Sequence, residues 1–85
     1  MVYVYVIKSK VANRLYFGMS ENVEKRLIEH NKGITQSTKP YRPWDLVFFE
    51  ELNNRMEARQ REKYLKSGVG KEFIKEKLKF APHFK

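Results

Sequence analysis

The sequence contains no cysteine, only one aspartate, Asp45, and only two histidines, His30 and His83. Without thiols, disulfide bonds and cysteine-ligated sites such as zinc fingers are excluded, which is typical of a protein from a reducing compartment. One aspartate cannot supply a cluster of aspartates around two metal ions. Two histidines are likewise too few for a multi-histidine metal site.

Long apolar runs are also missing, and none approaches the roughly 20 residues that a membrane-spanning helix needs. The N-terminal residues lack the basic-then-apolar pattern of an export signal. We therefore expect a cytoplasmic protein that has no membrane partner. No repeat or linker is visible, so we expect one domain over residues 1–80 and a C-terminal tail over residues 81–85.

Basic residues are abundant. The 85-residue chain has 18 lysines and arginines against 10 acidic residues, a net charge of +8. Such an excess on a short chain favours a polyanionic partner, either nucleic acid or an anionic membrane. The alternatives are a basic protein with no such partner and a protein-interaction module, but charge is their only support. The composition favours nucleic acid.

Residues 2–8 alternate in a way that predicts a β-strand. Tyr3, Tyr5 and Ile7 would share one face, and three valines would share the other. Because both faces are apolar, we expect this strand to be central in its sheet.

A short turn over residues 9–13 predicts an antiparallel hairpin with a second strand, which we expect Gly18 to end. This pairing would bring Tyr5 opposite or diagonal to Tyr16. A third strand is expected over residues 45–52.

Three helices are predicted between and after these strands. The first begins at Val23, with Ser20 or Asn22 as its N-cap, and ends near Gly33. The second is capped by Asn53 or Asn54 and ends near Lys66. The glycines of residues 67–71 are interpreted as a C-cap rather than a phosphate loop, and a last helix is expected over residues 71–78.

The corner between the second strand and the first helix carries residues suited to phosphate chemistry. Tyr16 precedes the turn, and Arg26 and His30 share one stripe of the helix. Arginine can grip phosphate oxygens, while tyrosine and histidine can carry protons. The alternatives are a packing tyrosine, a solvated arginine and a structural histidine, and each residue alone leaves both interpretations open.

Glu62 lies on the apolar stripe of the second helix, together with Ala58 and Leu65. Burying a carboxylate is costly unless it is paired, so we assign Glu62 to a metal ion or to a buried arginine. Glu57 is expected to form a surface ion pair with Arg61.

Further basic residues could contact a nucleic-acid backbone. Lys39 and Arg42 lie in a proline-containing connection that could follow the phosphates. Lys71 is expected at the start of the last helix, where backbone N–H groups attract anions. Trp44 could stack on a base, but a lid over the core is preferred.

Taken together, these residues resemble the GIY-YIG nuclease superfamily, in particular small stand-alone bacterial members related to the N-terminal nuclease module of the excision-repair protein UvrC. Residues 3–5 stand where the first motif belongs and residues 16–18 where the second does. Arg26 and His30 match the positions of the first helix, and Glu62 matches the metal-binding glutamate. The resemblance covers residues 2–78, and its first motif keeps Tyr5 although glycine and isoleucine are replaced.

The resemblance implies an α+β fold in which a three-stranded antiparallel sheet with a central first strand is flanked by about three helices. It also implies an endonuclease that hydrolyses phosphodiester bonds in nucleic acid, with DNA favoured over RNA as the substrate and a link to DNA repair. Tyr5 would be the general base, helped by Tyr16 and His30, and Arg26 would clamp the phosphate. One Mg²⁺ (or Mn²⁺) ion would be held by Glu62. The alternative is a nucleic-acid-binding module with this fold and little activity.

Overall fold

The computed structural model describes residues 1–79 and places them in an α+β fold around one sheet. The elements in chain order are β1 (Val2–Ser9), β2 (Leu15–Ser20), α1 (Val23–Lys32), the short 3₁₀ helix η1 (Lys39–Tyr41), β3 (Trp44–Leu52), α2 (Arg55–Lys66) and α3 (Gly68–Lys79). The three strands are antiparallel in the order β2-β1-β3. The predicted fold class and the central position of the first strand are therefore confirmed.

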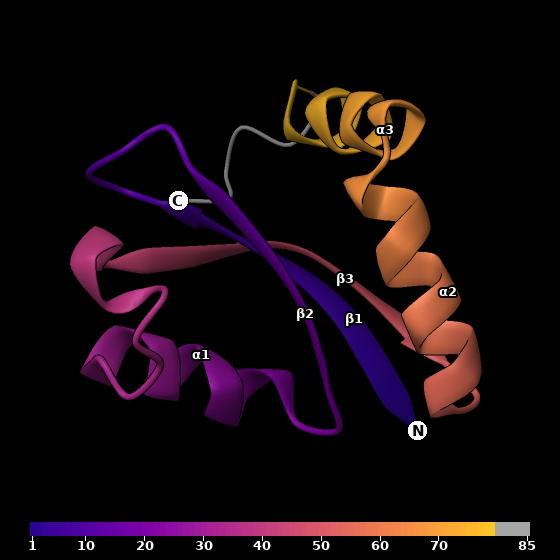
Figure 1. Ribbon diagram of the computed structural model, residues 1–85, viewed down its shortest axis with the longest axis horizontal. Coiled ribbons are helices and arrows are strands. Elements are labelled where there is room, and N and C mark those ends of the chain that lie inside the picture. The colour runs from indigo at the N-terminus through magenta and orange to yellow at the C-terminus, as the bar shows by residue number, and fades with distance from the viewer. Residues whose placement is uncertain (80–85) are drawn as a thin grey trace.

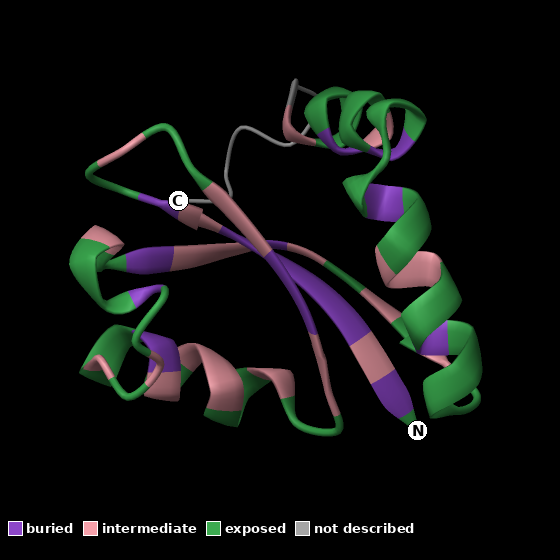
Figure 2. Cartoon of the chain, viewed as in Figure 1, coloured by how far each residue is buried: buried purple, intermediate pink, exposed green. Residues whose placement is uncertain are grey.

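The two faces of the sheet are covered by different helices (Figure 1). Tyr5 and Ile7 pack with Trp44 and with residues of α1 on one face. The valines of β1 pack with Ala58, Leu65 and Ile74 of α2 and α3 on the other. Figure 2 shows that β1 is buried along most of its length, as expected for a strand with two apolar faces.

Local capping fixes the helix ends. Asn22 accepts a hydrogen bond from the Lys25 amide (3.0 Å), and Gly33 ends α1 in the left-handed region at φ 83°. Asn54 caps α2, and the Glu57 side chain accepts from the Asn53 amide (3.3 Å). The predicted surface pair of Glu57 with Arg61 is wrong, because Arg61 donates to Glu50 of β3 at 3.0 Å.

The second strand does not end at Gly18 as predicted, but continues to Ser20. Gly18 lies opposite Tyr5 in the β1–β2 register. A Cβ atom on Gly18 would lie 2.7 Å from both Cζ and Oη of Tyr5. Glycine is therefore needed inside this strand so that the phenol ring can pass over it.

The last helix begins earlier than predicted. Gly68 and Gly70 form the first turn of α3, and Ser67 in extended conformation separates it from α2. A Cβ atom on Gly70 would collide with the Tyr64 carbonyl oxygen and with Cα of Leu65. Glycine at position 70 thus allows α3 to pack on the end of α2, which a local C-cap interpretation could not anticipate.

The connection between α1 and β3 is held against the sheet. Ser9 donates to the Tyr41 carbonyl at 2.7 Å. Trp44 is 3% exposed and its indole Nε1 donates to the Thr38 carbonyl at 2.9 Å. The predicted role of Trp44 as a lid over the core is confirmed.

Within residues 1–79, no helix is long and apolar enough to cross a membrane. The expected tail, residues 81–85, lies outside the described residues.

Candidate active site

A chain of hydrogen bonds runs through the interior between β1 and the connection that follows α1. The Tyr5 hydroxyl lies 2.9 Å from Nε2 of His30, and Nδ1 of His30 lies 2.8 Å from the Thr38 hydroxyl. Thr38 in turn donates to the Thr35 carbonyl at 3.2 Å. Tyr5, His30 and Thr38 are each no more than 1% exposed.

The secondary structure positions these groups. Tyr5 projects from the central strand toward the face that α1 covers, and His30 is in the last turn of α1. Among the described residues, no buried side-chain nitrogen or oxygen lacks a hydrogen-bond partner. The buried polar groups are therefore compatible with a stable core despite their desolvation.

Tyr16 and Arg26 lie beside this pair. Tyr16 is diagonal to Tyr5 across the β1–β2 pairing, and its ring centroid is 4.9 Å from that of His30. Arg26 forms a 2.8 Å ion pair with Glu29, and its guanidinium charge acts on the Tyr5 phenol. The predicted corner residues and Tyr5 thus form one cluster.

The surroundings keep the central pair neutral. Burial raises the pKa of the Tyr5 phenol, and the neighbouring Arg26 cation only partly opposes this effect. Burial also lowers the pKa of His30, and the Arg26 charge lowers it further. At neutral pH a protonated phenol therefore faces a neutral imidazole.

Glu62 lies on α2, which packs on the other face of the sheet from α1. Its side chain is 20% exposed and forms an ion pair with Lys66 at 3.0 Å. Its negative charge contributes to the raised pKa of Tyr5, so the carboxylate lies within electrostatic reach of the phenol. In residues 1–79 no three histidine, cysteine or acidic side chains group around a possible metal position.

The predicted phosphate-contacting residues lie in two places. Lys71 lines a hollow beside β2, together with Tyr16, Lys66 and Asn13. Lys39 and Arg42 line a different hollow on η1. Arg42 also donates to the Lys39 carbonyl at 3.0 Å, so part of its hydrogen-bonding capacity is used within the loop. Lys71 is the fourth residue of α3 rather than the first, and its amide is bonded to the Ser67 carbonyl.

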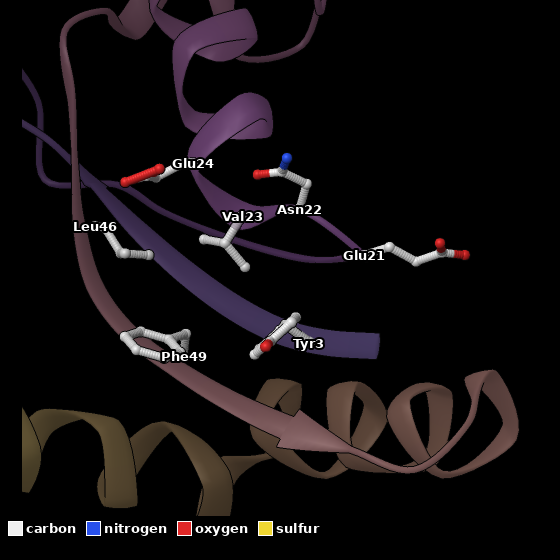
Figure 3. A pocket seen from close by; sticks show the side chains of 7 residues that line it. All are labelled: Tyr3, Glu21, Asn22, Val23, Glu24, Leu46 and Phe49. Atoms are coloured by element: carbon white, nitrogen blue, oxygen red, sulfur yellow. The ribbon is translucent and has the colours of Figure 1, made fainter. Parts of the chain in front are cut away.

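A third hollow lies at the start of α1 and contains none of the clustered residues (Figure 3). Tyr3 and Phe49 meet edge to face there, with ring centroids 6.2 Å apart. Glu21 and Glu24 stand at its rim. Two carboxylates make this hollow unsuitable for phosphate.

Comparison with known proteins shows the family of this chain. Residues 1–77 match the model of the GIY-YIG catalytic domain. The chain belongs to the GIY-YIG family. The family is one of nucleases, which gives this protein a nuclease-type domain and implies a nucleic-acid substrate.

Curated relatives of this GIY-YIG protein are small proteins named UPF0213. One from Clostridium perfringens is 43% identical over 67 residues, covering 78% of this chain and 71% of that protein. One from Staphylococcus saprophyticus is 39% identical over 66 residues, covering 76% and 79%. UPF0213 protein YazA of Bacillus subtilis is 37% identical over 79 residues, covering 88% and 79%. No solved structure matches the chain.

Sequence reasoning missed Thr38. Thr38 follows His30 by eight residues in an irregular segment, so neither helical nor strand periodicity connects the two. The close approach of Gly18 to Tyr5 was also missed, although a glycine inside a strand can signal such an approach.

Proposed function

We propose that this GIY-YIG protein is a divalent-metal-dependent endonuclease that hydrolyses phosphodiester bonds in DNA. The observation that carries the proposal is the buried pair of Tyr5 and His30, joined at 2.9 Å. A neutral phenol in contact with a neutral imidazole can accept a proton from water while it donates its own proton to the imidazole.

The proton path begins at the attacking water. As the water oxygen attacks phosphorus, its proton moves to Oη of Tyr5, and the phenolic proton moves to Nε2 of His30. The P–O ester bond then breaks, and the leaving oxygen takes up a proton from solvent water. This path avoids a free phenolate, which would be unfavourable because burial raises the pKa of Tyr5.

Arg26 is proposed to hold the scissile phosphate. Its side chain is 30% exposed and is paired with Glu29. A phosphate group offers the guanidinium a stronger bidentate partner than one carboxylate oxygen. Tyr16, beside both Tyr5 and His30, would orient the water or the phosphate.

Glu62 fits the metal role by its chemistry. Magnesium commonly binds through one or two carboxylates, with water and phosphate oxygens completing its shell. Glu62 would hold the Mg²⁺ or Mn²⁺ ion, and the ion would stabilise charge on the leaving oxygen as a Lewis acid. Lys66, the present partner of Glu62, would be free to turn toward a phosphate.

The hollow beside β2 is the proposed path of the nucleic-acid backbone. It joins Tyr16 of the cluster to Lys66 and Lys71. Lys39 and Arg42, at the separate hollow on η1, would contact more distant phosphates.

Cleavage of a panel of labelled DNA and RNA structures tests the function. We expect wild-type protein to cut DNA with Mg²⁺ or Mn²⁺ and not after chelation with EDTA. The second candidate is a binding module with little activity, which the net charge of +8 would also suit. Binding to the panel without any cleavage would overturn the proposal in favour of that module.

The metal role has its own test. Glu62→Gln removes the charge but little volume, so cleavage should be lost while nucleic-acid binding and the melting temperature change little. Glu57→Gln is the matched control on the same helix, because its amide oxygen can still accept the bond from Asn53. Equal losses from both variants would contradict the assignment of Glu62.

A further inference from the structure

We infer that Thr38 is a positioning residue, which fixes His30 in the tautomer that can receive a proton from Tyr5. A neutral imidazole carries its proton on one nitrogen only. Only a bare Nε2 can accept the phenolic proton, so the relay requires the tautomer protonated at Nδ1. The role of Thr38 in cleavage rests on the proposed function, whereas its effect on the His30 tautomer does not.

The hydrogen bonds beyond His30 select this tautomer. Thr38 has a single hydroxyl proton, and it donates to the Thr35 carbonyl at 3.2 Å. The same hydroxyl lies 2.8 Å from Nδ1 of His30. With its proton already used, the Thr38 oxygen accepts, and Nδ1 must be the donor.

The hydrogen bonding at Tyr5, on the other side of the His30 ring, leads to the same assignment. Among the described residues, the hydrogen bond found for the Tyr5 hydroxyl is the one to the His30 ring. The phenolic proton is then directed to Nε2 of His30, 2.9 Å away. In the opposite tautomer Nε2 would donate to the Tyr5 oxygen, and the phenolic proton would have no acceptor among the described residues.

Thr38 is itself held in place from both sides. Its carbonyl accepts from the Trp44 indole at 2.9 Å. Trp44 is fixed in turn by Asn31, which bonds both its amide (2.6 Å) and its carbonyl (3.1 Å). These bonds hold the backbone of Thr38 in place. The position from which its hydroxyl reaches His30 is therefore fixed as well.

The test is the ¹⁵N NMR spectrum of the His30 ring, recorded in a His83→Gln background so that one histidine remains. Protonated and bare ring nitrogens have widely separated shifts. We expect Nδ1 to be protonated and Nε2 bare in the wild-type background. A protonated Nε2 there would overturn the inference.

Thr38→Val and Thr38→Ser separate positioning from packing. Valine keeps the shape of threonine without the hydroxyl, so we expect the protonated nitrogen to change to Nε2 and cleavage to fall about tenfold or more. Serine keeps the hydroxyl, and should restore both the tautomer and turnover. An unchanged tautomer in Thr38→Val would overturn the inference, and so would a serine variant that behaves like valine.

The outcomes also distinguish this inference from the proposed function. If the wild-type protein cleaves no nucleic acid, the endonuclease proposal fails. The ¹⁵N spectra would still decide whether Thr38 sets the tautomer.

Discussion

At the residue scale, the buried contact between Tyr5 and His30 joins the two groups proposed to transfer protons. Tyr5 and His30 share a hydrogen bond in a region where charge is penalised, so both remain neutral until a reaction supplies the driving force. The Arg26 cation lies close enough to act on both pKa values. Neutral side chains and one nearby cation suit a site where negative charge develops on phosphate.

The lowered pKa of His30 predicts a specific pH dependence of stability. In the unfolded chain the imidazole takes up a proton below about pH 6.5, whereas the folded protein resists protonation. The unfolded state therefore binds more protons in this range, and the free energy of unfolding should fall as the pH drops. The slope is at most about 1.4 kcal/mol per pH unit.

Melting curves between about pH 7.5 and 5 would check this prediction, since the window spans the unfolded pKa of histidine. His30→Gln should flatten the pH dependence, while His83→Gln should retain it. The window stays above the range in which Glu29, whose pKa is lowered by Arg26, would contribute. The same slope in wild type and His30→Gln would show that His30 does not titrate as proposed.

Gly18 gives a second prediction at this scale. An added methyl would press against Cζ and Oη of Tyr5 at 2.7 Å, and the ring would have to move away from His30. We expect Gly18→Ala to lower cleavage more than it lowers binding of an uncleaved analogue. Equal activity of Gly18→Ala and wild type would mean that the position of the Tyr5 hydroxyl is not critical.

At the scale of elements, the packing of α3 on α2 depends on one glycine. Gly70→Ala would bring Cβ against the backbone of Tyr64 and Leu65, which cannot yield as a side chain could. Overpacking of this kind lowers the free energy of unfolding by about 1–3 kcal/mol. In a domain of this size, each kcal/mol lowers the melting temperature by about 4–8 °C. Gly68→Ala is the matched control in the same turn, because the new methyl would meet no atom within 4 Å beyond its chain neighbours and the backbone of its own helix.

Thermal denaturation followed by circular dichroism compares the two glycine variants. Gly70→Ala should melt well below wild type, and Gly68→Ala should not. The same melting temperature for both would mean that α3 can shift on α2 without cost.

Local patterns in the sequence predict the elements well, because alternation, caps and turns are local. The two faces of β1, the caps at Asn22 and Asn54, and the turn at Gly33 were all accessible. The contacts that the sequence could not predict join distant segments. Arg61 reaches Glu50 rather than Glu57 because β3 lies beside α2.

The candidate site also combines residues that the sequence could predict with one that it could not. Tyr5, Tyr16, Arg26, His30 and Glu62 could be selected by residue type and spacing. The structure places Tyr5, Tyr16 and His30 side by side and Arg26 near them, whereas Glu62 lies on α2 and pairs with Lys66. Thr38 could not be selected, because the connection over residues 33–43 has no period that would place it. Its role depends on how Trp44 and Asn31 hold that connection.

At the scale of the whole molecule, the net charge of +8 should govern binding. Phosphate contacts release counterions, so affinity should fall steeply with salt and differ little between sequences. Lys71→Ala should reduce the salt slope by about one unit, whereas Lys75→Ala, paired with Glu72 on the same helix, should change it less. Fluorescence anisotropy over a salt series measures this, and a flat response would contradict phosphate-led binding.

The central claim is that the Tyr5 hydroxyl transfers the proton that activates water. Metal-dependent cleavage by Tyr5→Phe tests it most directly, with Tyr3→Phe as the control two residues away on the same face of β1. Tyr5→Phe should lose about 10²–10⁴ in turnover while losing about 1–3 kcal/mol of stability, because Nε2 of His30 is left buried without its partner. Tyr3→Phe should cleave like wild type. Wild-type cleavage by Tyr5→Phe would contradict the account.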